Sequence, residues 1–122
     1  MVIDFHTHAF PEKIAAKTLA VLLKNVQTVE GIDHDAFTDG TMAGIKKSMA
    51  ESGVDYSLVL PIATTVAQST SINRFAKENT GKDGIISFGS LHPIQEDWEA
   101  VLEEIKDMGL LGIKLHPEYQ QF

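Results

Sequence analysis

Two histidines stand two residues apart near the start of the chain, in the sequence Asp-Phe-His-Thr-His at residues 4–8. The apolar opening Met-Val-Ile precedes this stretch and favours a β-strand. Side chains at positions i and i+2 of a strand share a face, with Cα atoms roughly 6–7 Å apart. Neutral imidazole nitrogens are good ligands for Zn²⁺ and similar ions. His6 and His8 are therefore candidate metal ligands, although a solvated strand end would also account for an isolated pair of this kind.

The composition narrows both the kind of metal site and the kind of partner. The 122 residues include no cysteine, so histidine and carboxylate side chains must supply any metal ligands. The formal net charge is −7 and no basic run is present, which argues against nucleic acid or an anionic membrane as a partner. The apolar runs are too short for a membrane span, and the chain does not open with a signal-peptide pattern. We therefore expect a soluble cytoplasmic protein.

Short apolar runs alternate with amphipathic stretches along the chain, which predicts a single α/β domain over residues 1–122. Strands are predicted at residues 1–5, 54–61, 85–91 and 110–115, and helices from residue 11 onward and at residues 41–52, 68–79 and 96–108. Residues 27–40 show little apolar periodicity and are predicted to form a loop. Strands that alternate with helices imply right-handed crossovers and a parallel sheet covered by helices.

Four motifs fall at the boundaries of these predicted strands, in order along the chain. They are Asp-Phe-His-Thr-His at residues 4–8, Glu-Ser-Gly-Val-Asp at 51–55, Ser-Leu-His-Pro at 90–93 and Gly-Ile-Lys-Leu-His-Pro at 112–117. In this order they resemble the N-terminal half of the amidohydrolase-related family of metal-dependent (β/α)8-barrel hydrolases, which also includes aminocarboxymuconate-semialdehyde decarboxylase. The resemblance implies a parallel half of a TIM barrel with about four strand-helix units, since a whole barrel needs about 250 residues. The chain is accordingly expected to be a truncated barrel.

The resemblance also implies a chemistry for the histidine pair. His6 and His8 would ligate a divalent ion, with Zn²⁺ expected and Mn²⁺ or Fe²⁺ as alternatives. The family's further ligands, a later histidine and an aspartate near the eighth strand, would lie beyond Phe122. The implied activity is hydrolysis of an amide, ester or lactone, and nonoxidative decarboxylation is the alternative that uses the same centre. These 122 residues alone are expected to be inactive.

The other candidate residues lie near the ends of the third and fourth predicted strands. Lys114 and His116 stand at i and i+2 and so share a face; at the strand end His116 is expected to bind metal or substrate. Lys114 has three open roles: contact with the substrate, an ion pair with an interior carboxylate such as Asp4, or carboxylation as in some relatives that bridge two metals. His92 either faces the active site or forms a turn with Pro93.

A different class of function is also open. If residue 122 is the natural end, the first and fourth strands of a half barrel would have unpaired edges. Such edges invite pairing with another copy of the chain. The protein would then be a noncatalytic module that assembles into a homo-oligomer.

Overall fold

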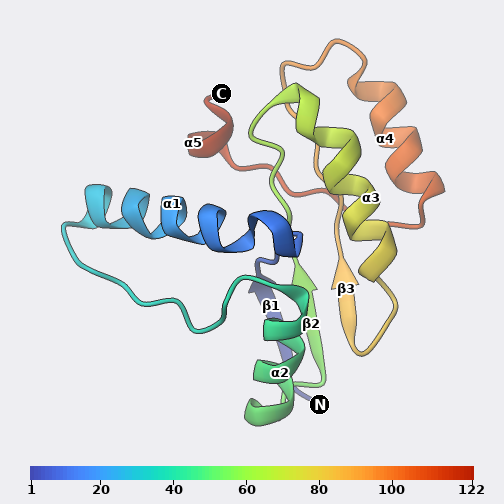
Figure 1. The fold of residues 1–122 in the computed structure, drawn as a ribbon. Coiled ribbons are helices and arrows are strands. Elements are labelled where there is room, and N and C mark those ends of the chain that lie inside the picture. Colours follow the sequence, from blue (N-terminus) through green and yellow to red (C-terminus); the bar gives the residue numbers. More distant parts are fainter.

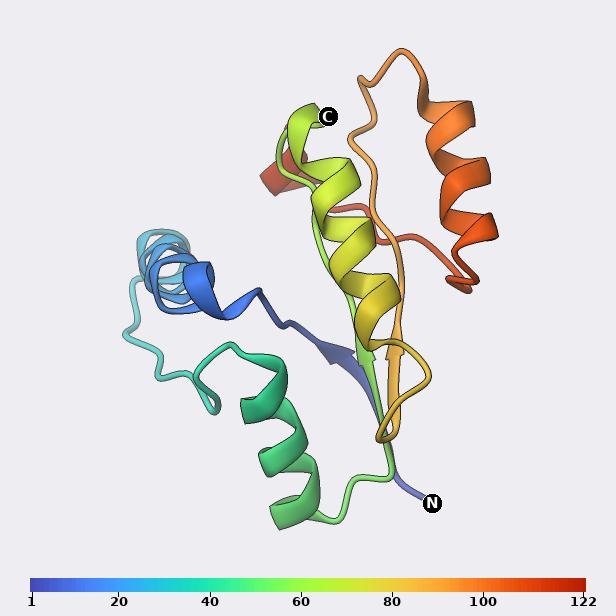
Figure 2. The same ribbon diagram turned by 45° about the vertical axis from the view of Figure 1, so that its right-hand side comes forward.

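A computed structural model describes all 122 residues and shows an α/β fold built on one parallel sheet (Figures 1 and 2). The three strands are arranged in the order β1-β2-β3. The elements along the chain are β1 (Ile3–Thr7), α1 (Glu12–Glu30), α2 (Met42–Ser52), β2 (Tyr56–Val59), the short 3-10 helix η1 (Val66–Gln68), α3 (Ser69–Asn79), β3 (Ile85–Ser87), α4 (Trp98–Asp107) and α5 (Pro117–Gln120). The predicted alternation of helices with parallel strands is confirmed.

Two helices connect β1 to β2, and the first is longer than predicted. α1 continues to Glu30, so residues 27–30 are helical rather than part of a loop. Gly31 ends the helix in the left-handed conformation, with φ of 70°, and its N–H donates to the carbonyl of Gln27. Figure 1 shows α1 beyond the carboxyl ends of the strands, whereas α2 runs beside the sheet. No helix combines the length and the apolar character needed to cross a bilayer.

One face of the sheet is packed by α2 and α3. Ile45 and Met49 of α2 form a buried cluster with Val59 of β2 and Ile85 of β3, and Phe75 of α3 packs against it. The residues that alternate with these on the strands point to the opposite side of the sheet. We call that side the open face; it carries Tyr56, Leu58 and Ile86, which are exposed or only partly buried.

The prediction of a regular fourth strand at residues 110–115 is wrong. Ile113 forms a single parallel bridge with Gly89. In this bridge the N–H of Gly89 donates to the Gly112 carbonyl and the N–H of Lys114 donates to the Gly89 carbonyl, both at 2.8 Å. The four predicted strand-helix units are thus three strands and one bridged segment, a partial parallel α/β unit.

The ladder between residues 89–91 and 112–116 ends because side chains form hydrogen bonds with its backbone groups. The Lys114 carbonyl accepts the hydroxyl of Ser90 at 2.9 Å, and the Ser90 N–H donates to Asn73 Oδ1 at 2.8 Å. Two residues later, the N–H of His116 donates to Oε1 of Gln120 at 2.7 Å. A backbone group that bonds a side chain is not available to extend a strand.

Candidate metal site

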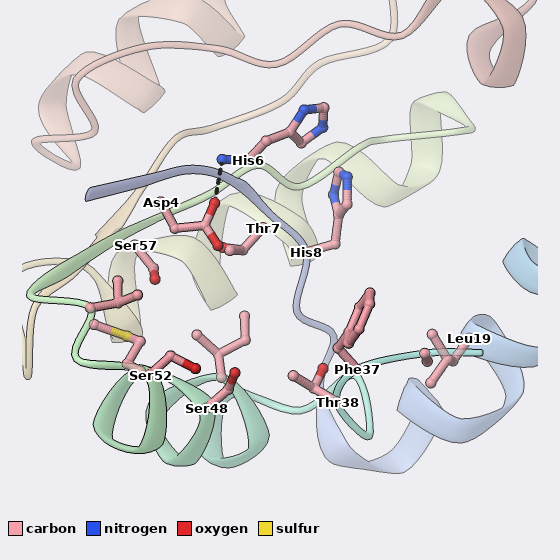
Figure 3. A pocket seen from close by; sticks show the side chains of 14 residues that line it. Asp4, His6, Thr7, His8, Leu19, Phe37, Thr38, Ser48, Ser52 and Ser57 are labelled. Atoms are coloured by element: carbon pink, nitrogen blue, oxygen red, sulfur yellow. Dashed lines mark hydrogen bonds between the residues drawn. The ribbon is translucent and has the colours of Figure 1, made fainter. Parts of the chain in front are cut away.

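The direction in which the histidine pair faces is decided by an irregularity in β1. Asp4 is paired with Ser57 and Thr7 with Val59, so β1 has one more residue than β2 between the two pairs. An extra residue interrupts the alternation of side chains along a strand. Asp4 and Thr7 consequently lie on the side of α2. Figure 3 shows the Asp4 carboxylate on that side and the rings of His6 and His8 pointing the other way.

The two imidazoles lie close together, and one of them is held by a hydrogen bond. Their ring centroids are 4.9 Å apart, with an interplanar angle of 67°. Nδ1 of His8 lies 2.8 Å from the carbonyl oxygen of Leu60. Because a carbonyl oxygen can only accept, Nδ1 must carry the proton in this bond, which leaves the lone pair on Nε2. Metal-binding histidines usually have this arrangement, in which the other ring nitrogen donates to a carbonyl or carboxylate.

The surroundings of His8 favour its neutral form. Burial lowers the pKa of the His8 imidazole below its usual value of 6.5, and the hydrogen bond to Leu60 opposes this effect. Positive charge on His6, Lys114 and His116 lowers that pKa further. Neutral imidazole is the form that binds a metal ion. Of the predicted site residues, His6, Lys114 and His116 thus lie near enough to His8 for their charges to act on it.

The position of Lys114 follows from the bridge between Gly89 and Ile113. A side chain at Gly89 would point at α4, where an added Cβ would lie 2.9 Å from Ile105. Ile113 is the bridge partner of Gly89 and shares its side, so Lys114, one residue later, points to the open face. This is the face to which the rings of His6 and His8 project.

The ion pair between Lys114 and Asp4, one of the roles predicted for Lys114, is wrong. The bulge in β1 places Asp4 on the opposite face of the sheet, where its Oδ1 accepts the N–H of His6 at 3.0 Å. The five ion pairs of the structure all involve other residues. Lys114, which is partly buried, thus has no carboxylate partner.

His116 has unmet hydrogen-bonding capacity. Its Nδ1 is buried and has no hydrogen-bond partner. Its ring stacks on Tyr119 of α5, with centroids 4.2 Å apart and an interplanar angle of 18°. Since a buried polar atom without a partner costs about 1–3 kcal/mol, such an atom is unusual in a folded protein.

His92 makes contacts that are local to a turn. It is 6% exposed. Its Nδ1 accepts the N–H of Ile94 in a long bond of 3.5 Å, and its carbonyl accepts the N–H of Gln95 at 3.0 Å. These contacts favour the turn alternative over a role in the site.

The donor set fits part of a metal site. No group of three or more His, Cys, Asp or Glu side chains converges closely enough to hold an ion. His6 and His8 can fill two positions of a coordination sphere, because they share a face and the tautomer of His8 exposes Nε2. Protein zinc sites use three or four protein ligands, so further ligands must complete the sphere.

A cavity of about 510 Å³ lies on the other side of β1, between this strand and α2 (Figure 3). Asp4 and Ser57 line it from the strands, and Ser48 and Ser52 line it from α2. His6 and His8 also line this cavity. Their rings, however, are directed away from Asp4 and from the side chains of α2 (Figure 3).

Sequence reasoning did not predict that Gln120 is buried and joins three parts of the chain by hydrogen bonds. Gln120 is 2% exposed, and its side-chain nitrogen donates to the carbonyls of Ala63 and Leu91, both at 2.8 Å. The one available signal was Pro117, which opens α5 at its first position, where proline is favoured. That signal predicts a helix start, but not the burial of a glutamine three residues later.

Comparisons of the chain with models of protein families, with curated proteins and with solved structures found no match. Function must therefore be inferred from the residues themselves.

Proposed function

We propose that the chain is part of a metal-dependent hydrolase of the amidohydrolase-related (β/α)8 family, in which His6 and His8 ligate a divalent ion, with Zn²⁺ expected. The observation that carries this proposal is the bond between His8 Nδ1 and the Leu60 carbonyl, which leaves Nε2 free beside the ring of His6. The parallel sheet and the place of the pair at the carboxyl end of β1 support it, because barrel enzymes carry their active sites at that end of the strands.

When bound, such an ion acts as a Lewis acid that activates water near neutral pH and polarises a carbonyl group. The proposed reaction is hydrolysis of an amide, ester or lactone in a small-molecule substrate. His8 stays neutral because of its burial, so protons compete weakly for its Nε2. The charges of Lys114 and His116 act on His8, and we assign these two residues contacts with the substrate.

Metal titration tests the ligand assignment. The wild-type chain, a His6→Ala/His8→Ala variant and a His34→Ala control are each stripped of metal and titrated with Zn²⁺ in a calorimeter. His34 is a suitable control because it is exposed and pairs with Glu30, away from the site. We expect one equivalent of Zn²⁺ to bind the wild type and the control, with affinity in the double variant lower by more than about tenfold. Equal binding by all three proteins would contradict the assignment.

Hydrolysis is tested separately with a chromogenic ester and the metal-loaded chain. A Zn²⁺-dependent rate that disappears in the double variant would support hydrolysis. If metal binds but no such rate is found, hydrolysis is not performed by these 122 residues alone, and the metal site remains.

A further inference from the structure

The side-chain amide of Gln120 occupies a place that a backbone bond would otherwise fill. After the bridge between Ile113 and Gly89, a continuing parallel ladder would join the N–H of His116 to the Leu91 carbonyl. Instead, His116 donates to Oε1 of Gln120 at 2.7 Å, and Nε2 of Gln120 donates to Leu91 at 2.8 Å. The Gln120 carboxamide therefore lies between the His116 N–H and the Leu91 carbonyl and bonds to both.

The chemistry of this position requires a carboxamide. The second N–H of the Gln120 amide donates to the Ala63 carbonyl at 2.8 Å, so both donors and the acceptor of the side chain are used. A glutamate at this position could accept but not donate, and a leucine could do neither. At 2% exposure, water cannot replace these bonds. One side chain thus joins the segments that follow β2 and β3 to His116.

The same short helix also holds the ring of His116. Tyr119, the residue before Gln120, stacks on that ring with centroids 4.2 Å apart. The backbone and the ring of His116 are therefore both held by α5, while its buried Nδ1 has no partner within the chain. Because the His116 ring is held in place and its charge acts on His8, this ring can contact a molecule that is bound at His8.

We propose that Gln120 is a positioning residue that holds His116 near the His6–His8 pair, so that the His116 ring can contact the other ligands of an ion bound there. This inference rests on the proposed function. It assigns no chemistry to Gln120 itself, which acts only through His116.

A double-mutant cycle in Zn²⁺ affinity tests the inference. We expect His116→Ala to weaken binding by about tenfold, as loss of an outer partner of a metal site does. Gln120→Met, which keeps the volume but removes the bonds, should weaken binding by a similar factor in the wild type and have no effect in the His116→Ala background. Tyr119→Leu is a milder second variant that should show the same dependence on His116.

Ser90→Ala is the matched control. Ser90 is buried in the same region and its hydroxyl bonds the Ala63 N–H and the Lys114 carbonyl, but it makes no hydrogen bond to His116. Zn²⁺ affinity should be unchanged in this variant. If Ser90→Ala lowers Zn²⁺ affinity as much as Gln120→Met does, the inference is overturned, because the loss then reflects general loosening of this region of the fold. The inference is also overturned if Gln120→Met still lowers Zn²⁺ affinity in the His116→Ala background.

A second measurement does not depend on metal. In the metal-free protein, nuclear Overhauser effects between the rings of His116 and Tyr119 should disappear in Gln120→Met and persist in Ser90→Ala. Unchanged ring contacts in Gln120→Met would overturn the inference. If the wild type binds no Zn²⁺, the proposed function fails, and these ring contacts still decide whether Gln120 positions His116.

Discussion

Nδ1 of His8 lies 2.8 Å from the carbonyl oxygen of Leu60, although the two residues are 52 positions apart in the chain. This bond joins the carboxyl end of β1 to the segment that follows β2. It fixes the ring of His8 in one tautomer and directs Nε2 away from the backbone. The spacing of the two histidines does not predict that Leu60 is the hydrogen-bond partner of His8, because it gives no information about where β2 ends.

His8 should titrate below its usual pKa of 6.5, chiefly because burial disfavours the imidazolium. The folded chain then binds this proton less readily than the unfolded chain. The contribution of His8 to stability is accordingly complete above pH 6.5 and is lost as the pH falls through the lower pKa of the folded state. Long-range ¹H–¹⁵N spectra of the metal-free protein should show the low midpoint and a protonated Nδ1 in the neutral form. A midpoint above 6.5 would contradict this expectation.

Gly84→Ala should destabilise the chain more than Gly53→Ala. Both glycines have positive φ, 76° and 68°, so alanine costs about 1–2 kcal/mol at either position. A Cβ at Gly84 would also overlap the carbonyl oxygen of Asp55, whereas nothing lies within 4 Å of a Cβ at Gly53. The difference between the two variants should be at least about 1 kcal/mol, as for other overpacked sites. Urea denaturation measures both, and equal losses would show that the overlap at Gly84 relaxes without cost.

Lys114→Met should leave the stability of the metal-free chain unchanged or raise it. Lys114 is partly buried and its ammonium group has no carboxylate partner. Its replacement therefore removes an uncompensated charge, while methionine keeps the packing of the stem. Lys106→Met is the control, because Lys106 is exposed and pairs with Glu103. A clear loss of stability on replacing Lys114, measured by thermal unfolding, would show that its charge has a stabilising partner in solution.

The ion pair between Lys46 and Asp83 should make stability depend on acid pH. A hydrogen bond and the charge of Lys46 lower the pKa of Asp83 below its usual value of 3.8. The contribution of the pair is therefore present above pH 3.8 and disappears as the pH falls through the lower pKa of the folded state. Asp83→Asn should lower the melting temperature slightly at pH 6, and the difference should vanish at the acid end and in high salt. A difference that persists in acid would exclude charge as its cause.

Much of the secondary structure could be predicted because its signals are local. α2 and α3 follow the apolar spacing of residues 41–52 and 68–79, and Gly53 ends α2 in the left-handed conformation that only glycine adopts freely. The parallel order of the strands follows from the helices between them, which leave no short hairpin connection. The position of the histidine pair at the carboxyl end of β1 was also accessible from the sequence.

The faces of β1 and the end of the ladder were decided by tertiary contacts. Strict alternation would place Asp4 on the side of His6, but the register against β2 introduces an extra residue and sends Asp4 to the other side. Likewise, an apolar run predicts a strand at residues 110–115, but Ser90 and Gln120 bond the backbone groups that would extend it. Alternation and apolar runs are properties of neighbouring residues, so the sequence by itself determined the parallel α/β order and the candidate ligands. Register and buried hydrogen bonds join residues tens of positions apart, so only the tertiary structure decided which side chains meet around His8.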